Sequence, residues 1–288
     1  MNCAVIDIGS NSVRLLVIKD GIPMPKFVKV TALAQGLSKD KVLKQAGIDR
    51  TYNAVCEFVA KAQNIGVQNI YIFATAAVRN SKNSNVLLSK IKDFCGVEVD
   101  VVSGTLEAQL GALGALCNND GAVVDIGGAS TEVAVVTNGK IVYSHSISWG
   151  AVTLTDYLED DMNIVQAFCD KIVGEYLFQS TANFYAIGGT ATSIAFLLSG
   201  LSEYNPKVVN GFVIDINSLL LLRNKLYSMS PSERESIAGL LPGRARIIGC
   251  GVCLLISVMN RFNLSSIKVS ESDNLEGYLS YKLGGAYE

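Results

Sequence analysis

One motif occurs twice in this chain, and it constrains the fold more than any other feature. Residues 4–8 and 122–126 are mostly apolar runs of strand character, and each carries one aspartate, Asp7 or Asp125, before a turn of small residues. A second β-rich run follows each turn. The pattern predicts two similar β-hairpins, one in each half of the chain.

The small residues in both turns indicate anion binding. They let backbone N–H groups approach a ligand closely, and concave turns of this kind favour phosphate. An aspartate in an apolar strand needs a cation or a hydrogen-bond donor nearby. A plain hairpin turn explains either motif alone equally well. A plain turn does not require the same aspartate twice, so the repeat favours a clamp that holds a phosphate chain and its metal.

Composition excludes several classes of protein. The 288 residues suffice for two domains, and the apolar share of 49% indicates extensive burial. A net charge of −2 gives no general attraction for nucleic acid, so anion capture must be local. No apolar run reaches the length of a membrane span. Residues 1–12 do not resemble a signal peptide, and the odd count of 7 cysteines predicts reduced thiols in a cytoplasmic protein.

Two other features invite a metal or redox role. Cys250 and Cys253 have the spacing of a redox or zinc motif, but no second cysteine pair or nearby histidine accompanies them. They fall within an apolar helix, so core packing is the favoured role. The single histidine, His145, is predicted to be structural. Its isolation excludes multi-histidine metal sites and leaves carboxylates as the expected acid–base groups.

Both halves of the chain show the same order of elements, three strands followed by alternating helices and strands. This order predicts α/β domains, each a mixed β-sheet flanked by helices. The helix-breaking residues 118–120 predict a hinge between domains of residues 1–118 and 119–288. The expected strands are residues 3–8, 12–18, 26–31, 69–74, 97–102, 121–126, 131–136, 140–146, 183–187 and 266–269. The expected helices are residues 49–65, 83–94, 105–117, 152–158, 164–177, 189–198, 215–228 and 244–262, with another start at Ser230 and a last helix from about residue 274.

Further motifs follow the two hairpins in a fixed order, at residues 74–79, 103–108, 150–152, 188–192 and 269–277. With these motifs the chain resembles the exopolyphosphatase/guanosine pentaphosphate phosphohydrolase family, within the sugar kinase–actin–heat-shock chaperone superfamily. The resemblance implies two ribonuclease-H-like (actin-like ATPase) domains with an inter-domain active-site cleft. It also implies a last helix that folds back on the first domain, and relatives suggest a homodimer.

Hydrolysis of a phosphoanhydride needs a metal to neutralise oxygens and a base to orient water. Asp7, Asp125 and Glu132 are the expected Mg²⁺ ligands, in part through water; a solvated strand residue is the alternative for Glu132. By resemblance, Glu107 is the catalytic base. Without the resemblance it is a glutamate suited to a helix N-terminus. Arg79 and Asp125 complete the predicted catalytic set, and an exposed arginine near a helix start is the alternative for Arg79.

The predicted phosphate-binding residues fall in three segments. Two are the hairpin turns, and the third is a glycine pair that begins a helix and resembles the nucleotide-side loop of the superfamily. Helix–strand packing also explains that glycine pair. The full set is Gly9, Ser10, Asn11, Ser12, Arg14, Gly127, Gly128, Ala129, Ser130, Thr131, Gly188, Gly189 and Thr190.

The chain departs from the family pattern at several positions. Ala129 stands where the family has a third glycine, and Gln109 stands where it has an arginine after Glu-Ala. Asn210 replaces a histidine, and Leu275 stands in the place of an arginine in the last motif. Because the predicted base and both aspartates are present, we expect an active enzyme.

The sequence therefore predicts a Mg²⁺-dependent exopolyphosphatase that releases terminal orthophosphate from inorganic polyphosphate. The same chemistry on guanosine pentaphosphate (pppGpp) is an alternative, and so is a non-catalytic phosphate or nucleotide sensor. A kinase is a fourth hypothesis, against which a glutamate serving water argues weakly. The sequence predicts no nucleic-acid or membrane partner. It does not decide between the two substrates, the polyphosphate chain length, the oligomeric state or the physiological role.

Overall fold

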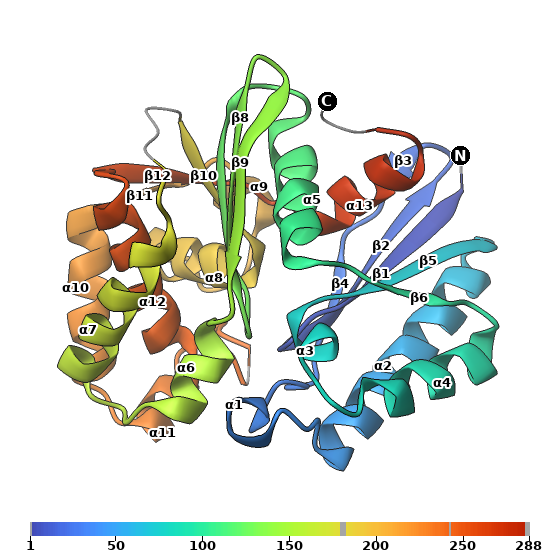
Figure 1. The fold of residues 1–288 in the computed structure, drawn as a ribbon, viewed down its shortest axis with the longest axis horizontal. Coiled ribbons are helices and arrows are strands. Elements are labelled where there is room, and N and C mark those ends of the chain that lie inside the picture. Colours follow the sequence, from blue (N-terminus) through green and yellow to red (C-terminus); the bar gives the residue numbers. More distant parts are fainter. Residues whose placement is uncertain (1, 179–182, 242, 286–288) are drawn as a thin grey trace. The chain divides into compact units, whose positions relative to one another are not determined.

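The computed structural model describes residues 2–178, 183–241 and 243–285, and within them the chain forms two compact units. Unit 1 spans Met1–Ser103 and unit 2 spans Gly104–Glu288. The division lies between Ser103 and Gly104, whereas the sequence prediction placed it after residue 118. Helix α5 (Gly104–Leu116), which that prediction gave to the first domain, therefore packs as part of unit 2 (Figure 1).

Unit 1 contains a six-stranded mixed sheet. Strand β1 pairs antiparallel with β2 and parallel with β5, which in turn pairs parallel with β6. The sheet order is β3-β2-β1-β5-β6, and β4 also pairs with β2. The strands are β1 (Cys3–Ile8), β2 (Ser12–Lys19), β3 (Ile22–Pro23), β4 (Phe27–Val30), β5 (Asn69–Ala74) and β6 (Val99–Val101).

Two longer helices cover the sheet of unit 1. Helix α2 (Gln45–Asn64) contacts β1 and β2, because its buried residues recur on one side, as in Val55, Phe58 and Val59. Helix α4 (Ser84–Cys95) packs on α2 and β6 and ends at a left-handed glycine, Gly96. Two single-turn helices, α1 (Leu37–Asp40) and α3 (Ala76–Arg79), complete the unit.

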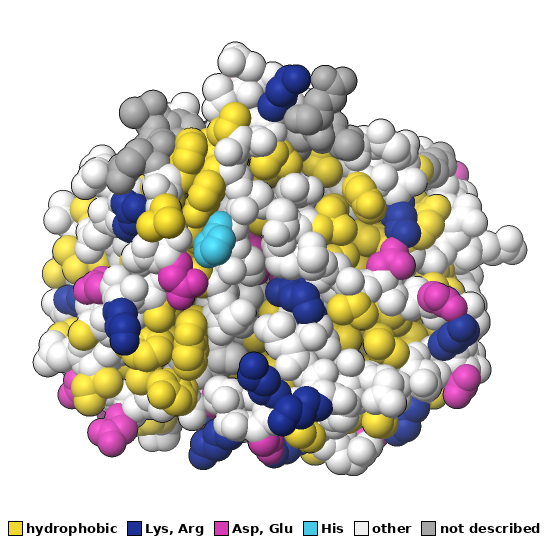
Figure 2. All heavy atoms as spheres, in the orientation of Figure 1, with side chains coloured by type: hydrophobic (Ala, Val, Ile, Leu, Met, Phe, Trp, Pro, Cys, Tyr) yellow, Lys and Arg dark blue, Asp and Glu magenta, His cyan; other side chains and the backbone are white. Residues whose placement is uncertain are grey.

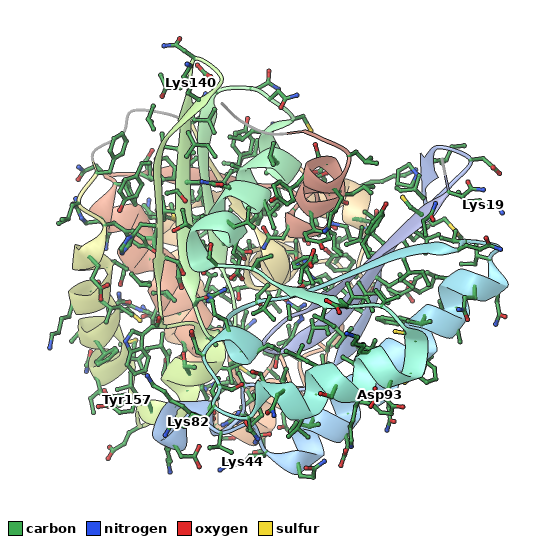
Figure 3. The ribbon with its side chains drawn as sticks, turned by 45° about the vertical axis from the view of Figure 1, so that its right-hand side comes forward. Lys19, Lys44, Lys82, Asp93, Lys140 and Tyr157 are labelled. Carbon is green, nitrogen blue, oxygen red and sulfur yellow. The ribbon has the colours of Figure 1, made fainter. Side chains whose placement is uncertain are left out.

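Unit 2 repeats the same plan around a second six-stranded sheet, in the order β11-β12-β10-β7-β8-β9. The β7–β8 and β8–β9 pairs are antiparallel, and β7 pairs parallel with β10 as β1 does with β5. The turn that follows β7 lies at the start of β8. The link from β8 to β9 lies at the opposite end of β8, where Lys140 is the first residue of β9 (Figure 3). The strands are β7 (Gly121–Ile126), β8 (Thr131–Thr137), β9 (Lys140–Ile147), β10 (Phe184–Ile187), β11 (Val213–Asp215) and β12 (Ser266–Val269).

The core of unit 2 lies on one face of this sheet, around α12 (Ile248–Arg261), whose residues 248–259 are all buried. Helix α12 contacts α6, α7, α8 and α10. The helices besides α5 and α12 are α6 (Ala151–Tyr157), α7 (Met162–Ile172), the 3₁₀ helix η1 (Val173–Glu175), α8 (Gly188–Ser199), α9 (Pro206–Val209), α10 (Ile216–Tyr227), α11 (Pro231–Glu235) and α13 (Asn274–Lys282).

Helix α5 packs on the other face of the sheet of unit 2, and α13 lies beside α5 (Figure 1). Glycines make this approach possible. A Cβ on Gly114 would lie 1.9 Å from the carbonyl oxygen of Asp273, and one on Gly277 would lie 1.8 Å from that of Leu110. The last helix, expected to fold back on the first domain, packs on α5, which the sequence prediction gave to that domain and the structure gives to unit 2.

The structure confirms most predicted elements and shifts some of their ends. The predicted helix 164–177 ends at Ile172, because the chain passes into η1 and then turns extended at Tyr176. The predicted helix 244–262 begins only at Ile248. The short elements β3, β11, α1, α3 and α9 were not predicted, since two to four residues carry too little periodicity to be recognised.

Candidate active site

The two hairpin turns have the same internal geometry. The Gly9 N–H donates to the carbonyl oxygen of Ser12, and the Gly127 N–H donates to that of Ser130, each over 3.0 Å. The glycines are required by this closure, because a Cβ on Gly9 would lie 2.9 Å from the Ser12 oxygen. The motif repeated in the sequence is therefore a repeated structure.

Both turns direct their carbonyl groups into the protein. The Ser10 oxygen accepts from Ala34 N over 2.8 Å, and the Gly128 oxygen accepts from Val152 N over 2.8 Å at the start of α6. Among the described residues, the N–H groups at positions 10, 11, 128 and 129 donate to no other residue. A turn with bound carbonyls and available N–H groups is suited to an anion.

In unit 1 the aspartate of the hairpin forms an ion pair. Asp7 lies opposite Arg14 in the β1–β2 register, and the guanidinium binds Asp7 Oδ2 through Nη2 at 2.6 Å and Nε at 2.8 Å. Both side chains are largely buried. Asp7, a predicted metal ligand, is thus bonded to Arg14, a predicted phosphate ligand.

In unit 2 the equivalent position holds a second acid. Asp125 lies opposite Glu132 in the β7–β8 register, and both are buried. Glu132 Oε1 accepts a hydrogen bond from Ser146 Oγ at 2.6 Å. Burial, with the charges of Glu107 and Asp125, raises the pKa of the Glu132 carboxyl well above its ordinary value, and hydrogen bonds from Ser130 and Ser146 oppose this only in part.

Strand alternation explains why these acids meet Glu107. Val123 of β7 and Ala134 of β8 pack on Ala108 and Ala112 of α5, so the same strand faces carry Asp125 and Glu132 toward that helix. Glu107 lies in the first turn of α5 and is 6% exposed. The structure therefore brings three predicted site residues together in unit 2. Glu132 is a buried member of this group, not a solvated strand residue.

The glycine pair at residues 188 and 189 lies against the same site. Gly188 has φ of 77°, and a Cβ there would lie 2.4 Å from Asp125 Oδ1. Thr190 Oγ1 donates to the carbonyl oxygen of Ile126 at 2.8 Å, which joins the start of α8 to the second hairpin. Only glycine permits this conformation and this contact. The third predicted phosphate segment thus adjoins Asp125.

Two residues of this site were not predicted from the sequence. Asn274 Nδ2 donates to Asp125 Oδ2 at 2.7 Å, and Arg244 Nη1 donates to the carbonyl oxygen of Gly189 and to Ser193 Oγ. Asn274 is the first residue of a helix. A polar residue at that position is common, so the sequence does not mark it as a site residue. Arg244 lies just before α12, and no signal in the sequence places it beside the glycine pair, which is 55 positions earlier.

The remaining predicted residues lie in unit 1. Arg79, the last residue of α3, donates from Nη1 to the carbonyl oxygen of Val102 at 2.8 Å. It is half-buried, not exposed. Asp7, Arg14 and Arg79 therefore belong to one unit, and Glu107, Asp125 and Glu132 belong to the other. The predicted inter-domain cleft, which would unite them, stays a prediction.

The acidic group of unit 2 fits a hydrated cation better than a bare one. Among the described residues, no three His, Cys, Asp or Glu side chains converge to hold a metal by themselves. Magnesium does not require that, because it keeps several waters and uses one or two carboxylates with substrate phosphates. Glu132 Oε2 is buried without a hydrogen-bond partner in the described chain, and like-charged groups lie near it. These donors suit a magnesium ion that retains water.

The structure favours the core-packing role for Cys250 and Cys253. All seven cysteines are unpaired, and Cys250 and Cys253 are buried within α12. Burial raises the pKa of the Cys253 thiol to about 12, so the thiolate needed for redox chemistry or zinc binding is disfavoured. His145, the single histidine, lies at the surface of β9 (Figure 2), and its Nε2 is 3.9 Å from Glu175 Oε2.

No helix in the described part of the chain is both long and apolar enough to cross a membrane.

Fold and site together define a class of protein: two α/β units, each built on a mixed sheet whose first hairpin carries an aspartate before a turn rich in N–H donors. The family model of the Ppx/GppA phosphatase family matches residues 5–284, so the chain belongs to this family.

Individual relatives agree with this assignment. The chain is 27% identical to the guanosine-5'-triphosphate,3'-diphosphate pyrophosphatase of Photobacterium profundum, and the match covers 95% of this chain and 58% of that protein. The chain therefore spans little more than half the length of that curated relative. The crystal structure of an exopolyphosphatase-like protein superposes with a TM-score of 0.90 at 25% identity, over 99% of each chain. The Ppx/GppA family member of Aquifex aeolicus superposes with a TM-score of 0.79 at 25% identity, over 98% of this chain and 97% of that chain. These likenesses confirm the predicted fold class of two mixed sheets flanked by helices.

Proposed function

We propose that this chain is a Mg²⁺-dependent phosphohydrolase that releases terminal orthophosphate from inorganic polyphosphate. The observation that carries the proposal is the group of three buried carboxylates, Glu107, Asp125 and Glu132, beside a turn with available N–H donors. Membership of the Ppx/GppA phosphatase family supports it. A buried acidic group next to an anion-binding turn is what a cation-bound polyanion requires.

Residues of unit 2 would bind the phosphate, hold the metal and activate the water. The N–H groups at positions 128 and 129 and the start of α8 donate to phosphate oxygens. Asp125 and Glu132 would hold the magnesium ion, which supplies charge neutralisation on the phosphate oxygens when bound. Glu107 orients the attacking water and accepts its proton. Its place in the first turn of α5 fixes the carboxylate against a rigid element.

Unit 1 offers a second set of phosphate ligands. The N–H groups at positions 10 and 11 are available in the same way, and Arg79 carries a planar donor fork. We propose that they bind phosphates farther along the chain. A homodimer, a cytoplasmic location, and the lack of nucleic-acid or membrane partners belong to the same proposal.

Guanosine pentaphosphate is the second candidate substrate, and one observation favours it. The curated relative at 27% identity is named for hydrolysis of that class of nucleotide. The reacting group is the same, a terminal phosphoanhydride, so the carboxylate site serves either substrate. The substrates differ only in what lies beyond the reacting phosphates.

A direct comparison tests the proposal. Purified protein is given polyphosphate or guanosine pentaphosphate under identical conditions, with magnesium or with a chelator, and released orthophosphate is measured. We expect magnesium-dependent release, and faster release from polyphosphate. Faster release from the nucleotide would reverse the order of the two substrates. No release from either would point to a sensor, and transfer of the terminal phosphoryl group to added ADP, with formation of ATP in place of orthophosphate, would point to a kinase.

A further inference from the structure

The side chain of Asn274 bonds directly to the carboxylate site. Its Nδ2 donates to Asp125 Oδ2 at 2.7 Å, and the two residues are 3% and 8% exposed. A donor to an ionised carboxylate forms one of the stronger hydrogen bonds in a protein, and burial strengthens it further. The bond joins residues 149 positions apart, so the tertiary fold must bring α13 to β7 to form it.

Asn274 has little freedom to move. It is the first residue of α13, directly after the N-cap Asp273, whose side chain accepts from Leu275 N at 3.0 Å. Glu276 Oε2 accepts from the Asp273 N–H at 2.9 Å and closes a capping box. A Cβ on Gly111 of α5 would lie 3.0 Å from Asn274 Oδ1. The helix start, its cap and the neighbouring helix together fix the amide.

The helix contact described above fixes α13 itself. The backbones of α5 and α13 touch at Gly114 and Gly277, where no Cβ would fit. Helix α5 also carries Glu107. This helix pair therefore carries the predicted base on α5 and the amide of Asn274 on α13.

The contact is one of those that orient Asp125. Its Oδ2 accepts from Asn274, and its Oδ1 lies over Gly188, within 2.4 Å of where a Cβ would be. Asn274 Oδ1 is buried and has no hydrogen-bond partner in the described chain. An acceptor left unmet at this depth costs free energy unless a ligand supplies a donor.

We propose that Asn274 is a positioning residue: it holds the Asp125 carboxylate in the orientation that binds a divalent cation. The inference rests on the proposed function, because it gives Asp125 the role of a metal ligand. Partners of metal ligands that make no contact with the metal typically change its affinity by about 10- to 100-fold when removed.

Manganese binding tests the inference without any need for turnover. Purified wild type and Asn274→Leu are titrated with Mn²⁺, and the free ion is measured by electron paramagnetic resonance. The leucine has nearly the same size but no donor. We expect Asn274→Leu to bind Mn²⁺ about 10-fold more weakly. Leu275→Val is the matched control, because Leu275 is the next residue of α13 and fully buried. It should lower the melting temperature and leave the Mn²⁺ affinity within about twofold, since it keeps the Asn274 amide.

A double variant separates positioning from general damage. In an Asp125→Asn background, Asn274→Leu should weaken Mn²⁺ binding no further, because its effect passes through Asp125. Unchanged Mn²⁺ affinity in folded Asn274→Leu overturns the inference, and so does an additive loss in the double variant. If the leucine variant does not fold, Asn274→Ser removes the same bond and carries the same expectation.

The inference and the proposed function fail separately. Absence of phosphate release by the wild type contradicts the function, while the Mn²⁺ titration still decides the role of Asn274. Normal release with an unaffected Asn274→Leu titration contradicts the inference alone. In an active enzyme, Asn274→Leu should raise the magnesium concentration needed for half-maximal rate and leave the rate at saturating magnesium within a few-fold.

Discussion

The hairpin of unit 1 and the hairpin of unit 2 close with the same bond and place an aspartate at the same point, yet they face different partners. Asp7 lies opposite Arg14, and Asp125 lies opposite Glu132. The first pair neutralises itself, with 2.6 Å between Arg14 Nη2 and Asp7 Oδ2. The second pair concentrates negative charge.

We propose that one residue in the second strand gives the two copies different roles. Buried like charges need a cation, whereas a buried ion pair satisfies its own charges. The neutral hairpin can present its N–H donors to phosphate without attracting metal. The acidic hairpin can attract metal and, through it, the reacting phosphate. The comparison predicts that the chemistry depends on unit 2 and that the stability of unit 1 depends on its ion pair.

The largest effect should follow loss of the carboxylate beside the acidic hairpin. Glu107→Gln keeps the shape of the side chain but cannot accept a proton from water, so turnover should fall by roughly 10²–10⁴-fold while the fold is retained. Orthophosphate release and circular dichroism measure the two effects. Glu98→Gln, at a surface ion pair with Lys92, is the control and should leave turnover unchanged. Normal turnover in Glu107→Gln would remove this residue from the mechanism.

The next effect concerns the neutral hairpin. Arg14→Met leaves Asp7 buried without its guanidinium partner and should lower the free energy of unfolding by about 3 kcal/mol. Urea denaturation followed by circular dichroism gives the value. Lys29→Met removes an exposed ion pair from the neighbouring strand and should cost no more than about 0.5 kcal/mol. Similar losses for both variants would show that the Asp7–Arg14 pair has no special weight.

Removal of one charge from the acidic hairpin should change how stability depends on pH. The pKa of Glu132 is raised in the folded state, so this group favours folding below its ordinary value of 4.5 and loses that contribution as pH rises toward the folded pKa. Without metal, wild-type stability should therefore fall with pH above 4.5, and Glu132→Gln should reduce that slope. Chemical denaturation in chelator at several pH values measures it. Equal slopes for the two proteins would contradict the assigned pKa shift.

The smallest effect concerns the turn of the acidic hairpin. Ala129 occupies the place that Asn11 holds in the first turn, and it is buried. Ala129→Gly restores the glycine of the family pattern and should lower the free energy of unfolding by about 0.5–1 kcal/mol, because glycine loses more freedom on folding. Denaturation and turnover are compared with the wild type. We expect turnover within about twofold, and a tenfold rise would show that Ala129 restricts the phosphate site.

The hairpins could be predicted from the sequence because their signals are local. An apolar strand, a turn of small residues and a second strand lie within about fifteen residues, and alternation fixes which side chains share a face. Once the turn closes between Gly127 and Ser130, Asp125 must lie opposite Glu132. Register therefore explains why two acids on neighbouring strands meet, and why Arg14 meets Asp7.

The parts that could not be predicted depend on distant contacts. Nothing local shows that α5 packs with the residues after it, because apolar residues lie along the whole helix and do not identify the sheet that it covers. The Asn274–Asp125 bond joins residues 149 positions apart, and neither residue's local sequence predicts contact with the other. Arg244 likewise reaches Gly189 from a segment that has no regular structure.

The distance along the chain between Asp125 and Asn274 also bears on how the protein is made. During translation β7 is synthesised long before α13. Asp125 is therefore present in the nascent chain before the Asn274 amide that binds it. Closing so long a loop is entropically costly and is expected late in folding. If Asn274 positions Asp125 as proposed, a nascent chain that stops before residue 274 carries the acidic hairpin and Glu107 but lacks the amide bonded to Asp125, and it should bind a divalent cation about tenfold more weakly than the finished chain.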